Sequence, residues 1–292
     1  MLHLVASDGL TVLSIIVKAL AYATTLISAG SILIACMLSS LSEDDRRHLA
    51  RLAGGLAFVA AIATTLRIPL RASFLMGGAL EGTFDPMMLA MVAESPLGTS
   101  VAVRLAGLGL ILPALLPHRW TWPVACLGAF IACASFSLRG HAMNEPRLLL
   151  GLLVTLHMLC LAFWLGAFAP LLRLNREAHA DRLGPVAEEF GRKALWAVGG
   201  LACAGGAVLW IFGGSDLRFF LSPYGQLLLV KLMLFAGVLA LAAVNKIRLT
   251  PAILAGNRSA RAKLRVSVRL EAALILAILL TTAAVTTVTS PG

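Results

Sequence analysis

The fold is decided by apolar stretches such as residues 147–172, which read RLLLGLLVTLHMLCLAFWLGAFAPLL. After Arg147 this stretch contains no charged residue. A helix needs about 20 consecutive apolar residues to cross the hydrocarbon core of a membrane, because each residue adds about 1.5 Å along the helix axis. The stretch therefore predicts a transmembrane helix.

Seven further stretches of the 292-residue chain have the same character, and only 13% of all residues are charged. Only helices and closed barrels satisfy every backbone polar group in lipid, and these stretches lack the alternating polar face of a barrel strand. We therefore predict an all-α fold, a polytopic membrane helix bundle that forms one integral membrane domain over residues 1–292. The eight predicted spans are residues 10–39, 49–67, 97–116, 120–138, 147–172, 194–212, 224–245 and 268–288.

Positive charge is distributed unevenly among the loops, and the net charge is +10. Of the 24 Lys and Arg residues, 16 lie in the loops after the first, third, fifth and seventh spans and 6 lie in or beside the other loops; Lys18 and Lys231 fall within spans. Cytoplasmic loops carry the excess of Lys and Arg, so both termini are expected on the outer side, which is the periplasm for a bacterial inner membrane. Topology and membrane lipid explain the basic loops, and no nucleic acid partner is expected.

Residues 68–96 are expected on the outer side. This segment is too long for a tight turn and too apolar for a solvated linker, so it predicts a structured cap or a partly embedded helix. Asp85 followed by Pro86 is typical of a helix start, because Asp caps the first turn and Pro fits its first position.

A weak internal repeat relates two helix starts. Ser95-Pro96-Leu97-Gly98 and Ser222-Pro223-Tyr224-Gly225 lie 127 residues apart, with four spans between the two copies. An even number of helices gives both copies the same orientation in the membrane. The sequence therefore predicts two parallel four-helix repeats, with halves at residues 1–138 and 139–292.

Each repeat carries a cation nine residues after its Ser, Arg104 in the first and Lys231 in the second. We expect the Arg104 side chain to extend to the membrane interface. The Lys231 side chain could extend to the interface in the same way or could line a polar cavity, and the sequence does not decide between the two.

Histidine and methionine residues provide the candidate metal ligands. His157 lies about 15 Å along its helix from residue 147, close to the middle of the bilayer, where an imidazole is costly without a partner. Imidazole and thioether groups together suit copper, and thioether favours Cu(I). The candidate ligands are His141, His157, Met143, Met87, Met88 and Met91, with Cys160 and Met158 as secondary candidates beside His157.

Other chemistry is not indicated. The sequence has no P-loop, HExxH, CxxC or Ser/His/Asp arrangement, so no enzyme activity is expected. The five cysteines all fall within predicted spans and are interpreted as packing residues. Glu271 is placed at the inner end of its span, so no carboxylate is expected in the middle of the membrane.

Three stretches in order resemble the CopD copper-resistance family. They are GHA at 140–142, LHMLCLAFWLGAFAPLL at 156–172, and SPYGQLLLVKLMLFAGVLALAAVNKIRLTP at 222–251, and the resemblance is strongest over 140–290. It implies an inner-membrane protein that passes copper ions from periplasm to cytoplasm, often beside a separate periplasmic CopC-like carrier. The family's recurring positions fall on His141, His157, Trp164, Gly166, Tyr224, Lys231 and Asn245.

Two other functions stay open on the sequence alone. A haem-binding membrane electron-transfer protein would need His157 and a second axial ligand such as Met158, Met233 or His141. A non-transporting assembly factor for copper enzymes would bind copper without moving it across the membrane.

Overall fold

The computed structural model describes residues 9–140, 144–176, 180–213 and 223–288, and these residues form helices and no strand. Eight helical segments are long and apolar enough to cross a membrane, and each contains most or all of one predicted span. The chain is therefore an all-α, multi-pass membrane protein, as predicted. The segments are Gly9–Met37, Glu43–Leu75, Pro96–Leu115, Thr121–Leu138, Arg147–Leu174, Asp181–Ile211, Leu228–Leu254 and Arg258–Thr287.

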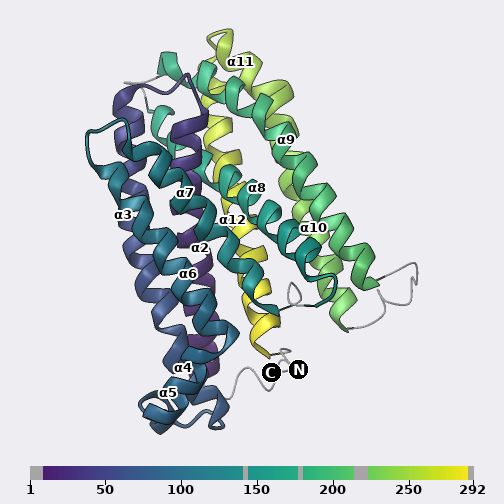
Figure 1. Ribbon diagram of the computed structural model, residues 1–292. Coiled ribbons are helices and arrows are strands. Elements are labelled where there is room, and N and C mark those ends of the chain that lie inside the picture. Colours follow the sequence, from purple (N-terminus) through teal and green to yellow (C-terminus); the bar gives the residue numbers. More distant parts are fainter. Residues whose placement is uncertain (1–8, 141–143, 177–179, 214–222, 289–292) are drawn as a thin grey trace.

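The elements follow one another up and down a single elongated bundle (Figure 1). The first are α2 (Gly9–Met37), α3 (Glu43–Thr65), α4 (Arg67–Leu75), η1 (Leu80–Thr83), α5 (Pro86–Glu94), α6 (Pro96–Ile111), η2 (Leu112–Leu115), α7 (Thr121–Ala134) and η3 (Ser135–Leu138). The others are α8 (Arg147–Leu174), α9 (Ala180–Gly213), α10 (Pro223–Val244), the π-helix η7 (Asn245–Leu249), α11 (Thr250–Leu254) and α12 (Arg258–Val288).

The two ends of the bundle are named here after the short helices that lie there (Figure 1). The α5 end carries α4 and α5, and the opposite α11 end carries α11. Helix α2 begins and α12 ends toward the α5 end, where the Lys18 Nζ atom lies 3.4 Å from the Thr287 Oγ1 atom. The α5 end corresponds to the side that the charge distribution predicts to be outside.

The segment before α6 is folded, as predicted, into α4, η1 and α5. The Asp85 side chain accepts a hydrogen bond of 2.8 Å from the Met88 backbone N–H, and Pro86 occupies the first turn of α5. Ser95 caps α6 in the same way, accepting from the Leu97 N–H at 3.2 Å. Both predicted helix starts at this end are confirmed.

Helices α2 and α8 cross in backbone contact. A Cβ atom built on Gly30 would overlap the carbonyl oxygen of Ala162, and one built on Gly166 would overlap the backbone of Gly30. Small residues permit this approach, which maximises van der Waals contact where no water is present to drive association. The crossing fixes the distance between α8 and α2.

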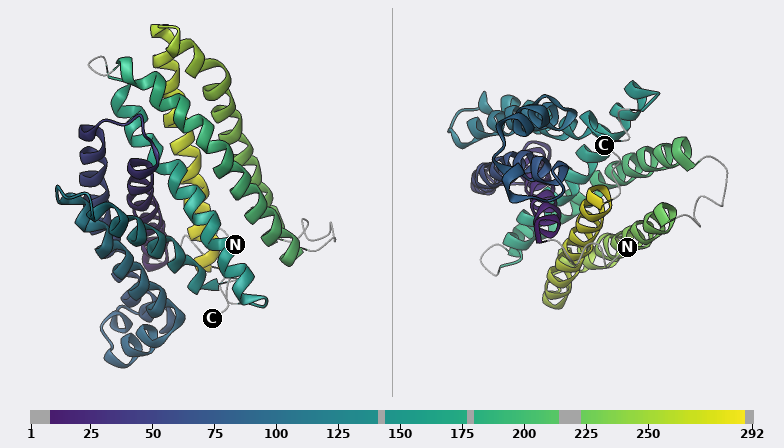
Figure 2. Two further views of the ribbon diagram at one scale, coloured as in Figure 1. Left: turned by 45° about the horizontal axis from the view of Figure 1, so that its top comes forward. Right: turned by 90° about the horizontal axis from the view of Figure 1, so that it is seen from below.

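Burial differs strongly between helices. In the apolar window of α2, 44% of the residues are buried inside the protein, whereas in the span Leu228–Leu254 the share is 6%. Seen along the bundle from below (Figure 2, right), α2 lies among other helices and α10 lies at the edge. Most of the surface of α10 is therefore left to lipid.

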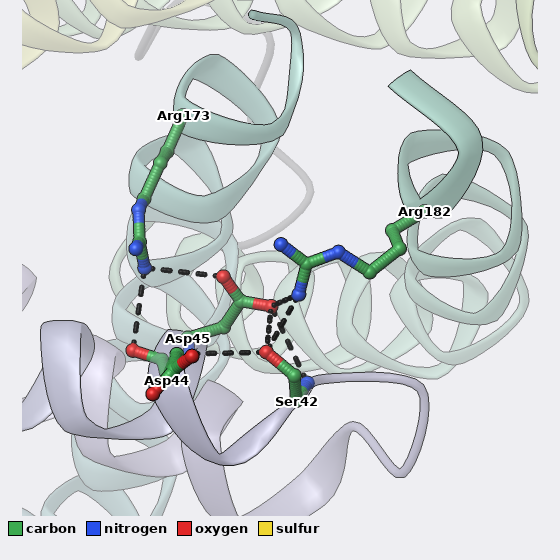
Figure 3. Close-up of polar contacts among 5 residues, drawn as sticks. All are labelled: Ser42, Asp44, Asp45, Arg173 and Arg182. Atoms are coloured by element: carbon green, nitrogen blue, oxygen red, sulfur yellow. Dashed lines mark hydrogen bonds and ion pairs between the residues drawn. The ribbon is translucent and has the colours of Figure 1, made fainter. Parts of the chain in front are cut away.

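The α11 end is held by a buried carboxylate (Figure 3). Asp45, at the start of α3, is 2% exposed and accepts from Arg173 of α8 at 3.1 Å and from Arg182 of α9 at 2.7 Å. The Arg182 guanidinium also donates to the hydroxyl of Ser42, which caps α3. Three helices are thereby joined at one point.

The expectation for Arg104 is wrong. Its side chain is 1% exposed, so it lies inside the protein and does not extend to the membrane interface. The reason is that α7 and η3 cover α6: the Arg104 Nε–H group donates to the Ser135 hydroxyl at 2.9 Å. The predicted relation between residues 1–138 and 139–292 stays a prediction.

Replacing Gly166 with Ala should destabilise the protein by about 1–3 kcal/mol, because the added methyl group forces α2 and α8 apart. The measurement is thermal unfolding of the purified protein in detergent. Gly205→Ala in α9 is the matched control, since a Cβ atom there meets nothing within 4 Å. An unchanged melting temperature for Gly166→Ala would contradict the crossing.

Candidate functional site

A carboxylate lies inside the protein on the last membrane-spanning helix. Glu271 is 3% exposed and is the fourteenth residue of the 30-residue span Arg258–Thr287. Five Arg and Lys residues precede it in α12, between Arg258 and Arg269, so its expected place at the inner end of the apolar run stays a prediction. Helix α12 begins ten residues before the predicted span, because the basic segment from Arg258 continues the same helix.

Two side chains donate hydrogen bonds to this carboxylate. The indole Nε1–H of Trp164 donates to the Oε2 atom of Glu271 at 3.1 Å. The side-chain amide of Asn245 donates to the Oε1 atom at 2.5 Å. An indole can only donate, so a buried Trp needs an acceptor, and Glu271 supplies it. We call these three residues the Glu271 node.

The Glu271 node joins three elements at an irregular point of the backbone. Trp164 lies on α8, Glu271 on α12, and Asn245 opens the π-helix η7 between α10 and α11. Short π-helical turns are rare and frequently occur at functional sites. Here the turn lies where the Asn245 side chain meets the carboxylate.

The node contains an unused acceptor. The Oδ1 atom of Asn245 is buried and has no hydrogen-bond partner among the described residues. A carboxylate and a free amide oxygen thus lie together inside the membrane-spanning region. The negative charge of the carboxylate attracts a cation or a proton. Ionisable groups within membrane-spanning helices are costly, and they commonly mark ion or proton pathways.

His157 lies on α8 on the side of the node nearer the α5 end. It precedes Trp164 by seven residues, which corresponds to roughly 10 Å along the helix. Met158 and Cys160 are partly buried against the main core beside it. Within the described ranges no group of three or more His, Cys, Asp or Glu side chains could hold a metal ion. The ligand role of His157 stays a prediction.

The other predicted ligands are separated from His157. Met87 and Met91 lie one turn apart on α5 and are 82% and 49% exposed, whereas Met88 packs against the small core around Val92. His141 and Met143 lie outside the described residues.

Two further positions that recur in the family are Lys231 and Tyr224, both on α10. Lys231 is half-buried on α10. Tyr224 lies in α10, but its side chain is outside what the structure describes. Of the secondary candidates, Trp164 and Asn245 are therefore brought together, and the residue that connects them is the Glu271 carboxylate.

A pair of cysteines at the α11 end forms a second group of possible metal ligands. The Sγ atoms of Cys36 on α2 and Cys126 on α7 lie 3.0 Å apart. Both line a cavity of about 930 Å³ together with Arg46, Arg51 and His118. Thiolate sulfur is the donor that Cu(I) prefers. The sequence alone does not indicate this pair, because Cys36 and Cys126 lie 90 positions apart in the chain.

The comparisons with known proteins concern copper. The family model described as "Copper resistance protein D" matches residues 184–285, which include Asn245 and Glu271. The one described as "Copper resistance protein D-like, N-terminal domain" matches residues 8–148.

A curated relative extends this similarity over most of the chain. The "Copper transport protein CutJ" of Bacillus subtilis (strain 168) is 26% identical over 266 residues, covering 86% of this chain and 48% of CutJ. The chain thus spans about half the length of this relative. No solved structure matches significantly.

Removing the thiol pair should reduce Cu(I) binding. The purified Cys36→Ser/Cys126→Ser variant is expected to retain roughly tenfold less Cu(I) than the unchanged protein in competition with a colorimetric chelator. Cys203→Ser in α9 is the control, because this exposed cysteine lies outside the cavity. Equal retention by all three proteins would exclude a site at the pair.

Proposed function

The chain belongs to the CopD copper-resistance family, and on this premise we propose that it transports copper ions across the bacterial inner membrane, from periplasm to cytoplasm. The observation that carries the proposal is the Glu271 node, a buried carboxylate beside a free amide oxygen within the membrane-spanning helices. The curated relative with a copper-transport name supports the same function.

The proposed route begins beside α5 and continues through the helices of the second half. Copper first meets His and Met groups at the α5 end, then His157 within α8, and then the Glu271 node. Several weak sites in succession suit conduction better than one tight cage, because an ion must leave each site as readily as it enters. The absence of a three-residue ligand cluster in the described ranges is compatible with such a route.

Glu271 has an electrostatic part in this proposal. A cation in the middle of the bilayer loses most of its hydration, and a negative charge nearby offsets part of that cost. The carboxylate and amide oxygens are harder donors than Cu(I) prefers. Direct ligation is therefore assigned to His157 and sulfur groups, while Glu271 stabilises the charge as the ion passes.

The α5 end is the proposed side of entry. It carries the exposed Met87 and Met91 side chains, and His141 and Met143 belong to the loop before α8. The charge distribution of the loops supports a periplasmic location for this end and for both termini. A separate CopC-like carrier is the proposed partner that supplies copper there.

Cells that express the chain should accumulate more copper than cells with an empty vector. At matched expression, His157→Ala and Glu271→Gln should each lower this gain by roughly tenfold, since each removes a group that lowers the energy of the ion within the membrane. Total cellular copper is measured by mass spectrometry after growth in copper-supplemented medium.

The controls are His48→Ala and Asp44→Asn, because both residues are exposed and lie on α3 at the α11 end, away from the proposed entry. Copper contents of His157→Ala and Glu271→Gln equal to that of the unchanged protein would refute the route. Equal copper in expressing and vector cells would instead favour the assembly factor.

A further inference from the structure

A group of buried and half-buried cations lies at the α5 end, mostly on helices of the first half. It comprises Lys18 of α2, Arg67 and Arg71 of α4, Arg104 of α6, and Arg139 directly after η3. Lys18 and Arg67 are 7% exposed and Arg104 is 1% exposed. We call these five residues the cationic cluster. It shares no residue with the Glu271 node.

The cluster is organised around two aromatic rings. The guanidinium carbon of Arg104 lies 3.9 Å from the ring centroid of Phe136 and 5.6 Å from that of Tyr22. The guanidinium of Arg67 lies over the same Tyr22 ring at 5.4 Å. Tyr22 is therefore in contact range of two arginines, and such cation–π contacts compensate only part of the cost of burying them.

No carboxylate neutralises these charges among the residues that the structure describes. The three ion pairs found there, Arg173–Asp45, Arg182–Asp45 and Lys193–Glu189, involve none of the five cations. The polar contacts of the most buried members are single neutral hydroxyls, Ser135 for Arg104 and Thr287 for Lys18.

A donor in the cluster is also unused. The Nη1 atom of Arg104 is buried and has no hydrogen-bond partner among the described residues. An unpaired buried charge costs several kcal/mol, and an isolated one within a membrane is especially unfavourable. Several such cations kept together require a negative charge that this part of the chain does not supply.

We propose that the cationic cluster binds a phosphate group. Arginine fits this ligand best, because its planar fork of N–H donors matches phosphate oxygens and remains charged. Arg104 is the ninth residue of α6, so it lies roughly 12 Å from the start of that helix. This depth is within reach of lipid headgroups at the α5 end, and basic pockets between transmembrane helices bind such headgroups. The phosphate belongs to an anionic phospholipid or is free inorganic phosphate.

The proposal is independent of copper transport. A cluster of five positive charges repels copper cations, so it serves as a bound-anion site and contributes no ligand to the proposed copper route. Its expected effect is to join α2, α4 and α6 through one ligand. Loss of the ligand should loosen the α5 end without removing the Glu271 node.

The test uses the full chain, purified in a neutral detergent and stripped of lipid. Its melting temperature is measured with added sodium phosphate against sodium chloride of equal ionic strength. A second series adds short-chain phosphatidylglycerol against an uncharged diacylglycerol of the same chain length. The variant is Arg104→Gln, and the control is Arg119→Gln, an exposed arginine at the other end.

We expect a rise of several degrees for the unchanged protein and for Arg119→Gln, and no rise for Arg104→Gln. A rise with phosphatidylglycerol alone identifies the lipid headgroup as the source, and a rise with sodium phosphate identifies the free ion. Arg67→Gln replaces Arg104→Gln if the latter does not fold. No rise in either series, an equal rise with chloride, or an equal rise in the Arg104 variant would overturn the proposal.

Discussion

The backbone contact between Gly30 and Gly166 is the constraint on which the rest of the bundle depends. Gly166 and Trp164 are two residues apart on α8, so they point to nearly opposite sides of the helix. One side of α8 is thereby pressed against α2, and the other presents the Trp164 indole to Glu271 of α12. The Trp-Leu-Gly sequence thus has a physical meaning: the glycine sets the distance to one helix and the tryptophan binds the next.

The two halves of the bundle hold buried charges of opposite sign. Glu271 provides a buried negative charge in the second half, with donors from Trp164 and Asn245. Lys18, Arg67 and Arg104 provide buried positive charge in the first half, without a carboxylate in the described part of the chain. A copper cation would be attracted to the first of these regions and repelled by the second. We infer that the halves have different tasks, although their helices follow the same up-and-down order.

The sequence was sufficient to predict a membrane protein with eight spans, because long apolar runs without an alternating polar face can satisfy their backbone polar groups in lipid only as helices. It was also sufficient for the starts of α5 and α6, where a capping residue and a proline act locally. It failed where a result depended on tertiary packing. Arg104 was expected at the interface, but η3 covers it, and this cannot be read from residues near it in the chain.

The site was predicted only in part for the same reason. Trp164 and Asn245 were named through a family resemblance, while Glu271 was set aside because nothing near it in the sequence shows that it bonds to both of them. The cysteine pair of α2 and α7 offers no local signal at all.

The most direct test of the account is copper flux in lipid vesicles that contain only the purified chain. Vesicles loaded with a fluorescent copper indicator are exposed to external copper, and the initial rate of the signal is compared with that of protein-free vesicles. The account predicts a faster rate with the chain and a return to nearly the protein-free rate with Glu271→Gln. A rate with the unchanged protein equal to that of protein-free vesicles would contradict copper transport by this chain.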